Sequence, residues 1–127
     1  MSSVLAICIG ASAGALARWG LALYLNQGSL PWGTLAANLI GGYLIGICVA
    51  VFNAMPELDP VWRLALVTGC LGALTTFSSF SAEVVGMLQA SRFAWAVGTA
   101  AMHLLGSLML TYLGMKTATL FIATSAV

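Results

Sequence analysis

Residues 69–83 read GCLGALTTFSSFSAE, and this stretch indicates both how the chain folds and where its function resides. Within it, hydroxyl, aromatic and carboxylate side chains crowd together, although the flanking sequence is almost entirely apolar. Polar groups at membrane depth are costly and usually mark a path for ions or substrate. The residues concerned are Thr75, Thr76, Phe77, Ser78, Ser79, Phe80, Ser81 and Glu83.

The composition places the chain in a lipid bilayer. Of its 127 residues, 61% are hydrophobic and 6% are charged, whereas an ordinary soluble domain is about 25% charged. A soluble domain of this size could not bury so much apolar surface. The net charge of +1 provides no basic surface for nucleic acid. We therefore expect an all-α, multi-pass membrane protein with no nucleic-acid partner.

Four apolar segments are long enough to span a bilayer, for which about 20 helical residues suffice. The third segment carries Gly69, Gly72 and the hydroxyl cluster in its middle, which predicts a break in the helix near Gly72–Thr76. Such a break is tolerated only where the freed backbone groups face protein, water or an ion. The segments cover residues 3–25, 34–53, 61–90 and 93–121, within a single domain of residues 1–127.

Small and polar residues recur at every fourth position in three of the segments. Small residues let helices approach closely in lipid, and stripes that also carry polar groups tend to face a cavity or a partner. The first stripe predicts packing alone, whereas the other two leave packing and cavity lining open. The stripes are Gly10 and Gly14; Thr34, Asn38, Gly42 and Gly46; and Thr99, His103, Ser107 and Thr111.

The basic residues define no preferred orientation in the membrane. With four spans, Arg63 and Lys116 lie toward one side, and Arg18 and Arg92 lie toward the other. The two sides therefore carry equal numbers of basic residues, and the positive-inside rule predicts no orientation. Either a partner fixes the direction of insertion, or the chain inserts both ways and pairs as an antiparallel, dual-topology homodimer. We favour the homodimer, because four short helices do not easily enclose a lined pathway.

The third span presents an aromatic and hydroxyl face after its predicted break. Ring edges carry partial positive charge, and hydroxyl and carboxamide groups supply hydrogen-bond donors. Such a face could bind a small anion without the full positive charge that would trap it. Phe77 and Phe80 are close enough along a helix to border one groove. Helical geometry places four residues on one face: Thr76, Ser79, Phe80 and Glu83.

Two charged side chains inside apolar segments have more than one interpretation. Glu83 repels anions unless burial protonates it or a hydroxyl pairs with it, and it could instead serve protons or cations. Arg18 either snorkels to the interface or makes an electropositive vestibule. The chain has one histidine, His103, and no arrangement of a nucleophile with a base. We therefore do not expect an enzyme.

Four stretches together resemble the Fluc (CrcB) family of fluoride channels. The resemblance runs through the whole chain in order. Its most specific part is TTFSSFS combined with the asparagine of the second span. The stretches are GCLGALTTFSSFSAE (69–83), WGTLAANLIGG (32–42), GASAGALARW (10–19) and HLLGS (103–107).

The resemblance implies a dual-topology antiparallel homodimer in a bacterial-type inner membrane. Two pathways in the dimer would export fluoride passively and protect the cell from it. A structural sodium ion at the dimer centre would be held by the backbone carbonyls of Gly72 and Thr75. The implied pathway residues are Asn38, Phe77, Phe80, Ser79, Thr34, Ser107 and Glu83, with Arg18 in the vestibule.

Thr76, Ser81 and His103 complete our set of candidate pathway residues. His103 departs from the family, which carries hydroxyl-type residues at about this level. Its imidazole either alters the pH dependence of transport or simply packs.

Two other functions share some of these features. A small dual-topology multidrug transporter, which exchanges protons for a drug, has similar length and charge balance. It typically needs an acid in its first helix, and residues 3–25 contain none. A non-transporting membrane subunit would use the polar stripes only to bind its partner.

Overall fold

The computed structural model describes residues 2–28 and 30–125, and helices account for nearly all of them. Four stretches are long and apolar enough to cross a membrane, and no β-strand occurs in the part of the chain described. This confirms the predicted all-α class with four spans. The helices are α1 (Ser2–Leu25), α2 (Trp32–Ala54), α3 (Pro60–Arg63), η1 (Leu64–Leu71), α4 (Gly72–Leu74), α5 (Phe77–Gln89) and α6 (Phe93–Ser125).

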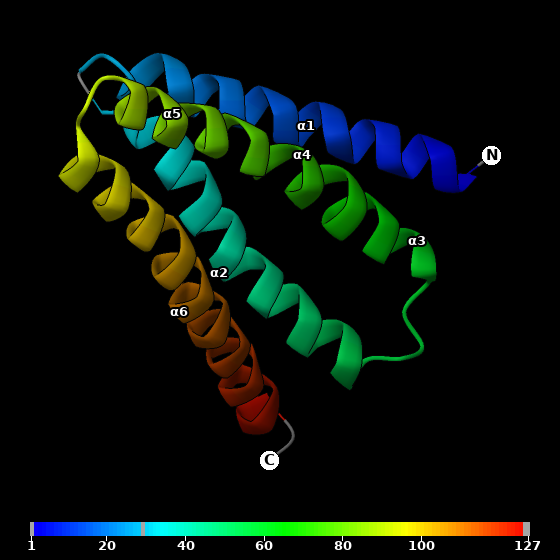
Figure 1. The fold of residues 1–127 in the computed structure, drawn as a ribbon. Coiled ribbons are helices and arrows are strands. Elements are labelled where there is room, and N and C mark those ends of the chain that lie inside the picture. Colours follow the sequence, from blue (N-terminus) through cyan, green and yellow to red (C-terminus); the bar gives the residue numbers. More distant parts are fainter. Residues whose placement is uncertain (1, 29, 126–127) are drawn as a thin grey trace.

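The spans form two arms that meet at one end and diverge toward the other (Figure 1). In one arm, α1 packs against α3, η1 and α4, and in the other, α2 packs against α6. The arms meet where α5 lies over the start of α2 and of α6. The loop between α2 and α3 crosses the open end (Figure 1). The chain therefore leaves a hollow between its own arms.

The third span is broken close to the predicted position. Helix α4 ends at Leu74, and Thr75 and Thr76 are extended, with ψ of 152° and φ of −149° respectively. The Thr76 side chain accepts a hydrogen bond from the Ser79 amide and so caps α5. The helix continues through Gly72, so the break lies at the C-terminal end of the predicted interval. The π-helix η1 was not predicted; such segments are frequent at functional sites.

Glycines bring the helices of each arm together. A Cβ at Gly10 or Gly14 would overlap the backbone carbonyls of Ala65 and Cys70 in the third span, and one at Gly46 would overlap that of Thr111. Close approach at such positions maximises van der Waals contact where lipid provides no hydrophobic driving force. The packing role predicted for the first stripe is confirmed, and the second stripe does both, because Gly46 packs against α6 whereas Asn38 lines the groove.

Two helix boundaries differ from the prediction by more than one residue. Helix α2 begins at Trp32 rather than 34, because Pro31 lies just outside the helix and its carbonyl accepts from the Leu35 amide. Helix α6 continues to Ser125 rather than 121. Residues 122–124 contain neither glycine nor proline to end it.

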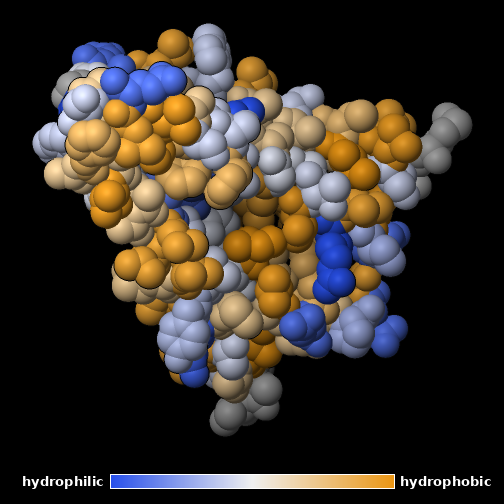
Figure 2. Space-filling view, in the orientation of Figure 1, coloured by the Kyte–Doolittle hydropathy of each residue, from blue (hydrophilic) through white to orange (hydrophobic). Residues whose placement is uncertain are grey.

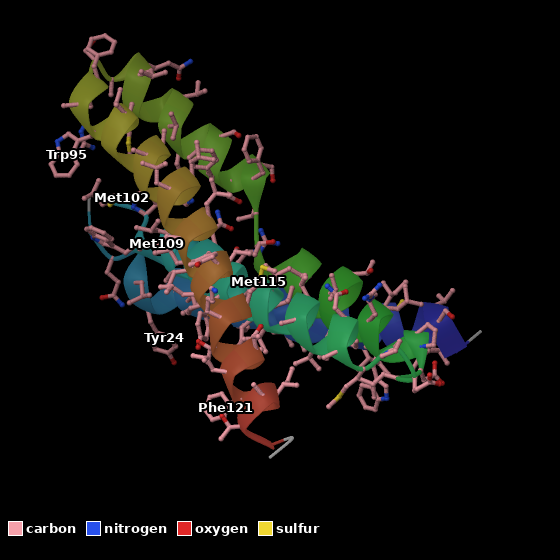
Figure 3. The ribbon with its side chains drawn as sticks, turned by 90° about the horizontal axis from the view of Figure 1, so that it is seen from below. Tyr24, Trp95, Met102, Met109, Met115 and Phe121 are labelled. Carbon is pink, nitrogen blue, oxygen red and sulfur yellow. The ribbon has the colours of Figure 1, made fainter. Side chains whose placement is uncertain are left out.

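The outer surface is apolar, as a lipid-facing surface must be. Figure 2 shows a largely hydrophobic face that is hollowed between the arms, with hydrophilic residues mainly toward the helix ends. Large apolar side chains are exposed along the whole length of α6 (Figure 3), including Trp95, Met102, Met109 and Met115. The core itself is small and centres on Ala37, Leu71 and Leu74.

Candidate functional site

Two cavities lie on either side of the break in the third span. The first, which we call the groove, has a volume of about 490 Å³ and lies between the arms. The second, the vestibule, has a volume of about 370 Å³ and lies toward the end where the arms meet. Thr76 lines both cavities. Candidate residues in the groove are Asn38, Gly72, Thr75, Phe77, Phe80, His103 and Ser107, and those in the vestibule are Arg18, Thr34, Ser79 and Glu83.

Asn38 holds the break open at the junction of the two cavities. Its Oδ1 accepts from the Thr76 amide at 2.7 Å, and its Nδ2 donates to the Thr76 carbonyl at 3.0 Å. Nδ2 also lies 3.0 Å from Nδ1 of His103 on α6. The carboxamide thus replaces the backbone hydrogen bonds that an uninterrupted helix would provide. One side chain of α2 therefore ties the broken span to both neighbouring helices.

The two phenylalanines border the groove, which confirms the predicted arrangement. The Phe77 and Phe80 ring centroids are 5.3 Å apart, with an interplanar angle of 61°. Phe80 also lies against His103, with centroids 4.5 Å apart and an angle of 33°. Phe77 is 79% exposed in the single chain. Phe80 is thus fixed by neighbours within the chain, whereas Phe77 faces outward.

The vestibule combines a base, an acid and hydroxyl groups. The Thr34 hydroxyl donates to Oε1 of Glu83 at 2.5 Å, and the Thr76 hydroxyl donates to that of Ser79 at 3.1 Å. Arg18 is partly buried in the same wall. The other carboxyl oxygen of Glu83, Oε2, is buried and makes no hydrogen bond to any residue in the described ranges. Glu83 therefore pairs with a hydroxyl, which is one of the arrangements that the sequence left open.

The family model described as CrcB-like protein, Camphor Resistance (CrcB) matches residues 5–115. This range includes most of each of the four spans and every residue that lines the two cavities. The chain belongs to the CrcB family. Proteins named fluoride-specific ion channel FluC are among its relatives. The one from Albidiferax ferrireducens is 75% identical over 97% of this chain and 95% of the relative.

Two further relatives carry the same name. The protein from Variovorax paradoxus is 67% identical over 89% of this chain and 91% of its own length. That from Paracidovorax citrulli is 60% identical over 95% of this chain and 97% of its own. With its four apolar helices, this CrcB chain is an integral, multi-pass membrane protein.

The structure separates residues that the helical projection grouped together. Thr76, Ser79 and Glu83 line the vestibule, but Phe80 lines the groove, because α5 forms the wall between the two cavities. Ser81 lines neither of them, and its hydroxyl donates to the Phe77 carbonyl at 2.8 Å within α5.

Sequence reasoning missed several lining residues. Asn26 and Trp19 belong to the vestibule, and Gly41 and Thr111 belong to the groove. Thr111 was predicted only as part of a stripe, and Asn26 lies just beyond the first predicted span. Gly41 lies next to the striped Gly42 and carried no separate signal.

The break also removes helical partners from two backbone carbonyls. In a continuous helix, the amides of Thr76 and Ser79 would donate to the carbonyls of Gly72 and Thr75. Here the Thr76 amide donates to Asn38, and the Ser79 amide donates to the Thr76 hydroxyl. Both carbonyls therefore lack their helical donors, and both residues line the groove. Such freed oxygens suit a hard cation.

Proposed function

We propose that this CrcB chain forms a fluoride-specific ion channel, which lets fluoride leave the cell down its gradient and so relieves fluoride toxicity. The proposal rests on relatives up to 75% identical that are named fluoride-specific ion channel FluC, together with the chemistry of the two cavities. The chain is a transport protein rather than an enzyme. The bacterial relatives support a location in the inner membrane.

The observation that carries the proposal is the junction at Thr76, where a polar vestibule meets an aromatic groove. Arg18 would attract an anion into the vestibule, and the hydroxyls of Thr34 and Ser79 would replace part of its water. Beyond the junction, the edges of Phe77 and Phe80 offer only partial positive charge. Conduction requires binding that is weak enough for release, and no charged side chain lines the groove among the described residues.

Reconstituted liposomes test this function directly. Purified protein in vesicles loaded with fluoride should release it rapidly, whereas matched vesicles loaded with chloride should retain their anion. Protein-free liposomes measure the background leak. A dimer of normal size that passes no fluoride would reject the proposal and favour a non-transporting subunit. Proton-coupled drug uptake would instead identify a multidrug transporter.

We further propose that two copies assemble as an antiparallel homodimer with dual topology. The groove opens between the arms of one chain, and Phe77 is largely exposed there, so a second copy would close the wall. Balanced charges on the two sides permit both insertions. Cysteines introduced near a terminus should then be labelled from both faces of the membrane. Labelling from one face alone would exclude dual topology.

A structural sodium ion would suit the freed carbonyls of Gly72 and Thr75. It would neutralise their partial negative charge where the two broken spans of a dimer meet. No cluster of three or more His, Cys, Asp or Glu side chains that could hold a metal occurs in the described residues, so backbone oxygens are the ligands that the proposal requires. Asn38 would keep the Gly72 carbonyl free by occupying the Thr76 amide, and the Thr76 hydroxyl would keep the Thr75 carbonyl free by occupying the Ser79 amide.

Sodium removal should weaken the dimer. When N-methylglucamine replaces sodium at constant ionic strength, we expect the particle mass in detergent to shift from dimer toward monomer, because the two sets of carbonyl dipoles then repel each other. Light scattering coupled to size exclusion measures the mass, and restored sodium should reverse the shift. An unchanged dimer with unchanged flux in sodium-free buffer would reject the sodium site.

A further inference from the structure

A third cavity adjoins the vestibule at the end where the arms meet. This side pocket has a volume of about 360 Å³ and lies between the loop that joins α1 to α2 and the turn that joins α5 to α6 (Figure 1). Its walls include Asn26, Gly86 and Arg92. Asn26 and Glu83 line both this pocket and the vestibule, so the two cavities meet at these two side chains. The vestibule therefore continues sideways into a second hollow of nearly equal size.

The side pocket contains a basic group that no acid neutralises. Arg92 is partly buried, and its guanidinium lies 5.6 Å from the centre of the Trp95 ring. It makes no ion pair with any residue that the structure describes. The one acid that lines either cavity among the described residues is Glu83, whose Oε1 already accepts from Thr34. With Arg18 in the vestibule, two bases therefore face one acid along the joined cavities, which favours the entry of anions.

Asn26 places a hydrogen-bond donor where the two cavities meet. Its Oδ1 accepts from the Gly33 amide at 2.6 Å in the first turn of α2, where Pro31 provides no side-chain cap. Because that oxygen is committed to the end of the helix, the other polar atom of the carboxamide is nitrogen. This Nδ2 makes no hydrogen bond to any residue in the described ranges. Its two N–H groups are therefore free to bind an anion at the junction.

We propose that the side pocket is a second entrance to the vestibule for fluoride, in which Arg92 attracts the ion and Nδ2 of Asn26 transfers it to the vestibule. This inference rests on the proposed fluoride channel, and it extends the path beyond Arg18 to the α1–α2 loop and the α5–α6 turn. A carboxamide suits the junction because it donates hydrogen bonds without a full charge, so it binds the ion weakly enough to release it.

Asn26→Asp separates transfer of the ion from capping of α2. Aspartate can still accept from the Gly33 amide, and a carboxylate is favourable at a helix N-terminus, so the fold should be retained. The free donor becomes an anionic oxygen, so we expect fluoride flux to fall severalfold in dimers of normal size. Asn53→Asp adds the same charge at an exposed position outside the groove, the vestibule and the side pocket, and it should conduct like the unmodified protein. Equal flux in the two variants would show that Asn26 only caps α2.

The charge of Arg92 should matter most when little salt is present. Arg92→Gln keeps a polar side chain but removes the charge, so we expect a severalfold loss of fluoride flux at about 0.01 M ionic strength, where the Debye length is about 30 Å. The loss should disappear near about 1 M, where this length is about 3 Å. Lys116→Gln, near the other end of α6 and outside all of these cavities, should show no such dependence. Equal flux in the two variants at every ionic strength would reject the role of Arg92.

Chemical labelling inside the side pocket tests whether the ion passes through it. Gly86 lines the pocket, and a Cβ placed there would have no close contact outside its own stretch of helix, so a cysteine fits. The three natural cysteines are first replaced by alanine. Gly86→Cys labelled in detergent with an anionic methanethiosulfonate should then conduct fluoride severalfold more slowly than the unlabelled variant. Gln89→Cys, on the same helix but outside the pocket, should be unaffected by this label. Complete labelling of Gly86→Cys, verified by mass spectrometry, without loss of flux would exclude the second entrance.

These outcomes differ from failure of the channel itself. Absence of fluoride flux from the unmodified dimer would reject the proposed function. Normal flux that ignores both the label at Gly86→Cys and the substitution Asn26→Asp would reject only the second entrance, and fluoride would then enter past Arg18 alone. Asn26→Asp and Arg92→Gln are made in the chain with its natural cysteines, so they decide the question even if the cysteine-free protein does not assemble.

Discussion

Asn38→Ala is expected to lower fluoride flux by roughly 100-fold, the largest effect of any single substitution proposed here. The change removes the partner of both the amide and the carbonyl of Thr76, and it also frees Nδ1 of His103. A buried group left without a partner costs about 1–3 kcal/mol, and about 1.4 kcal/mol corresponds to tenfold in an equilibrium. Loss of two such hydrogen bonds should therefore lower the population of the conformation with an interrupted third span by about 100-fold. Fluoride efflux from liposomes measures the effect.

Asn53→Ala provides the matched control for this substitution. Asn53 lies on the same helix, α2, but it is exposed near the C-terminal end and lines neither the groove nor the vestibule. The fluoride flux of the Asn53→Ala variant should equal that of the unmodified protein. If Asn38→Ala assembles as a dimer and conducts at the rate of the control, Asn38 does not hold the break, and the junction at Thr76 is not the working part of the pathway.

Phe80→Ile should reduce fluoride flux by at least about tenfold while the protein keeps its assembly. Isoleucine is apolar, but it lacks a ring edge with partial positive charge, and it cannot form ring pairs, which are worth about 0.5–1.5 kcal/mol each. Phe80 contacts both Phe77 and His103, so the substitution also loosens two neighbours in the groove. Efflux rates at several fluoride concentrations, with the dimer mass measured on the same sample, provide the readout.

Phe93→Ile is the control for the loss of an aromatic ring. Phe93 begins α6 and is 62% exposed on the outer surface. The same chemical change there should leave flux unaltered. Equal fluoride flux in Phe80→Ile and Phe93→Ile dimers would contradict the view that ring edges bind the ion, and would leave hydroxyl and amide donors to account for it.

Much of the fold could be predicted because lipid makes each span satisfy its backbone locally. Apolar runs of about 20 residues or more therefore marked all four spans. The glycine and hydroxyl cluster in the third span located its break to within a few residues. Phe77 and Phe80 were correctly placed on one groove, since their spacing along α5 determines their separation.

The candidate site was only partly predictable, because its decisive contacts join distant parts of the chain. Asn38 bonds to Thr76, 38 positions away, and to His103, 65 positions away. No periodicity within one helix encodes such a contact. The division of α5 between groove and vestibule likewise depends on where the two arms diverge, so Phe80 and Glu83, which share one face of the helix, line different cavities.

By itself, then, the amino-acid sequence determined the membrane class, the number of spans, the interruption near Thr76 and the kinds of side chain available to an ion. These properties follow from local composition and spacing. Only the tertiary structure decided that Asn38 replaces the helical hydrogen bonds at the break, that Glu83 pairs with Thr34, and that Asn38 contacts Nδ1 of His103. Each depends on the packing of separate helices, which positions atoms that the sequence alone does not bring together.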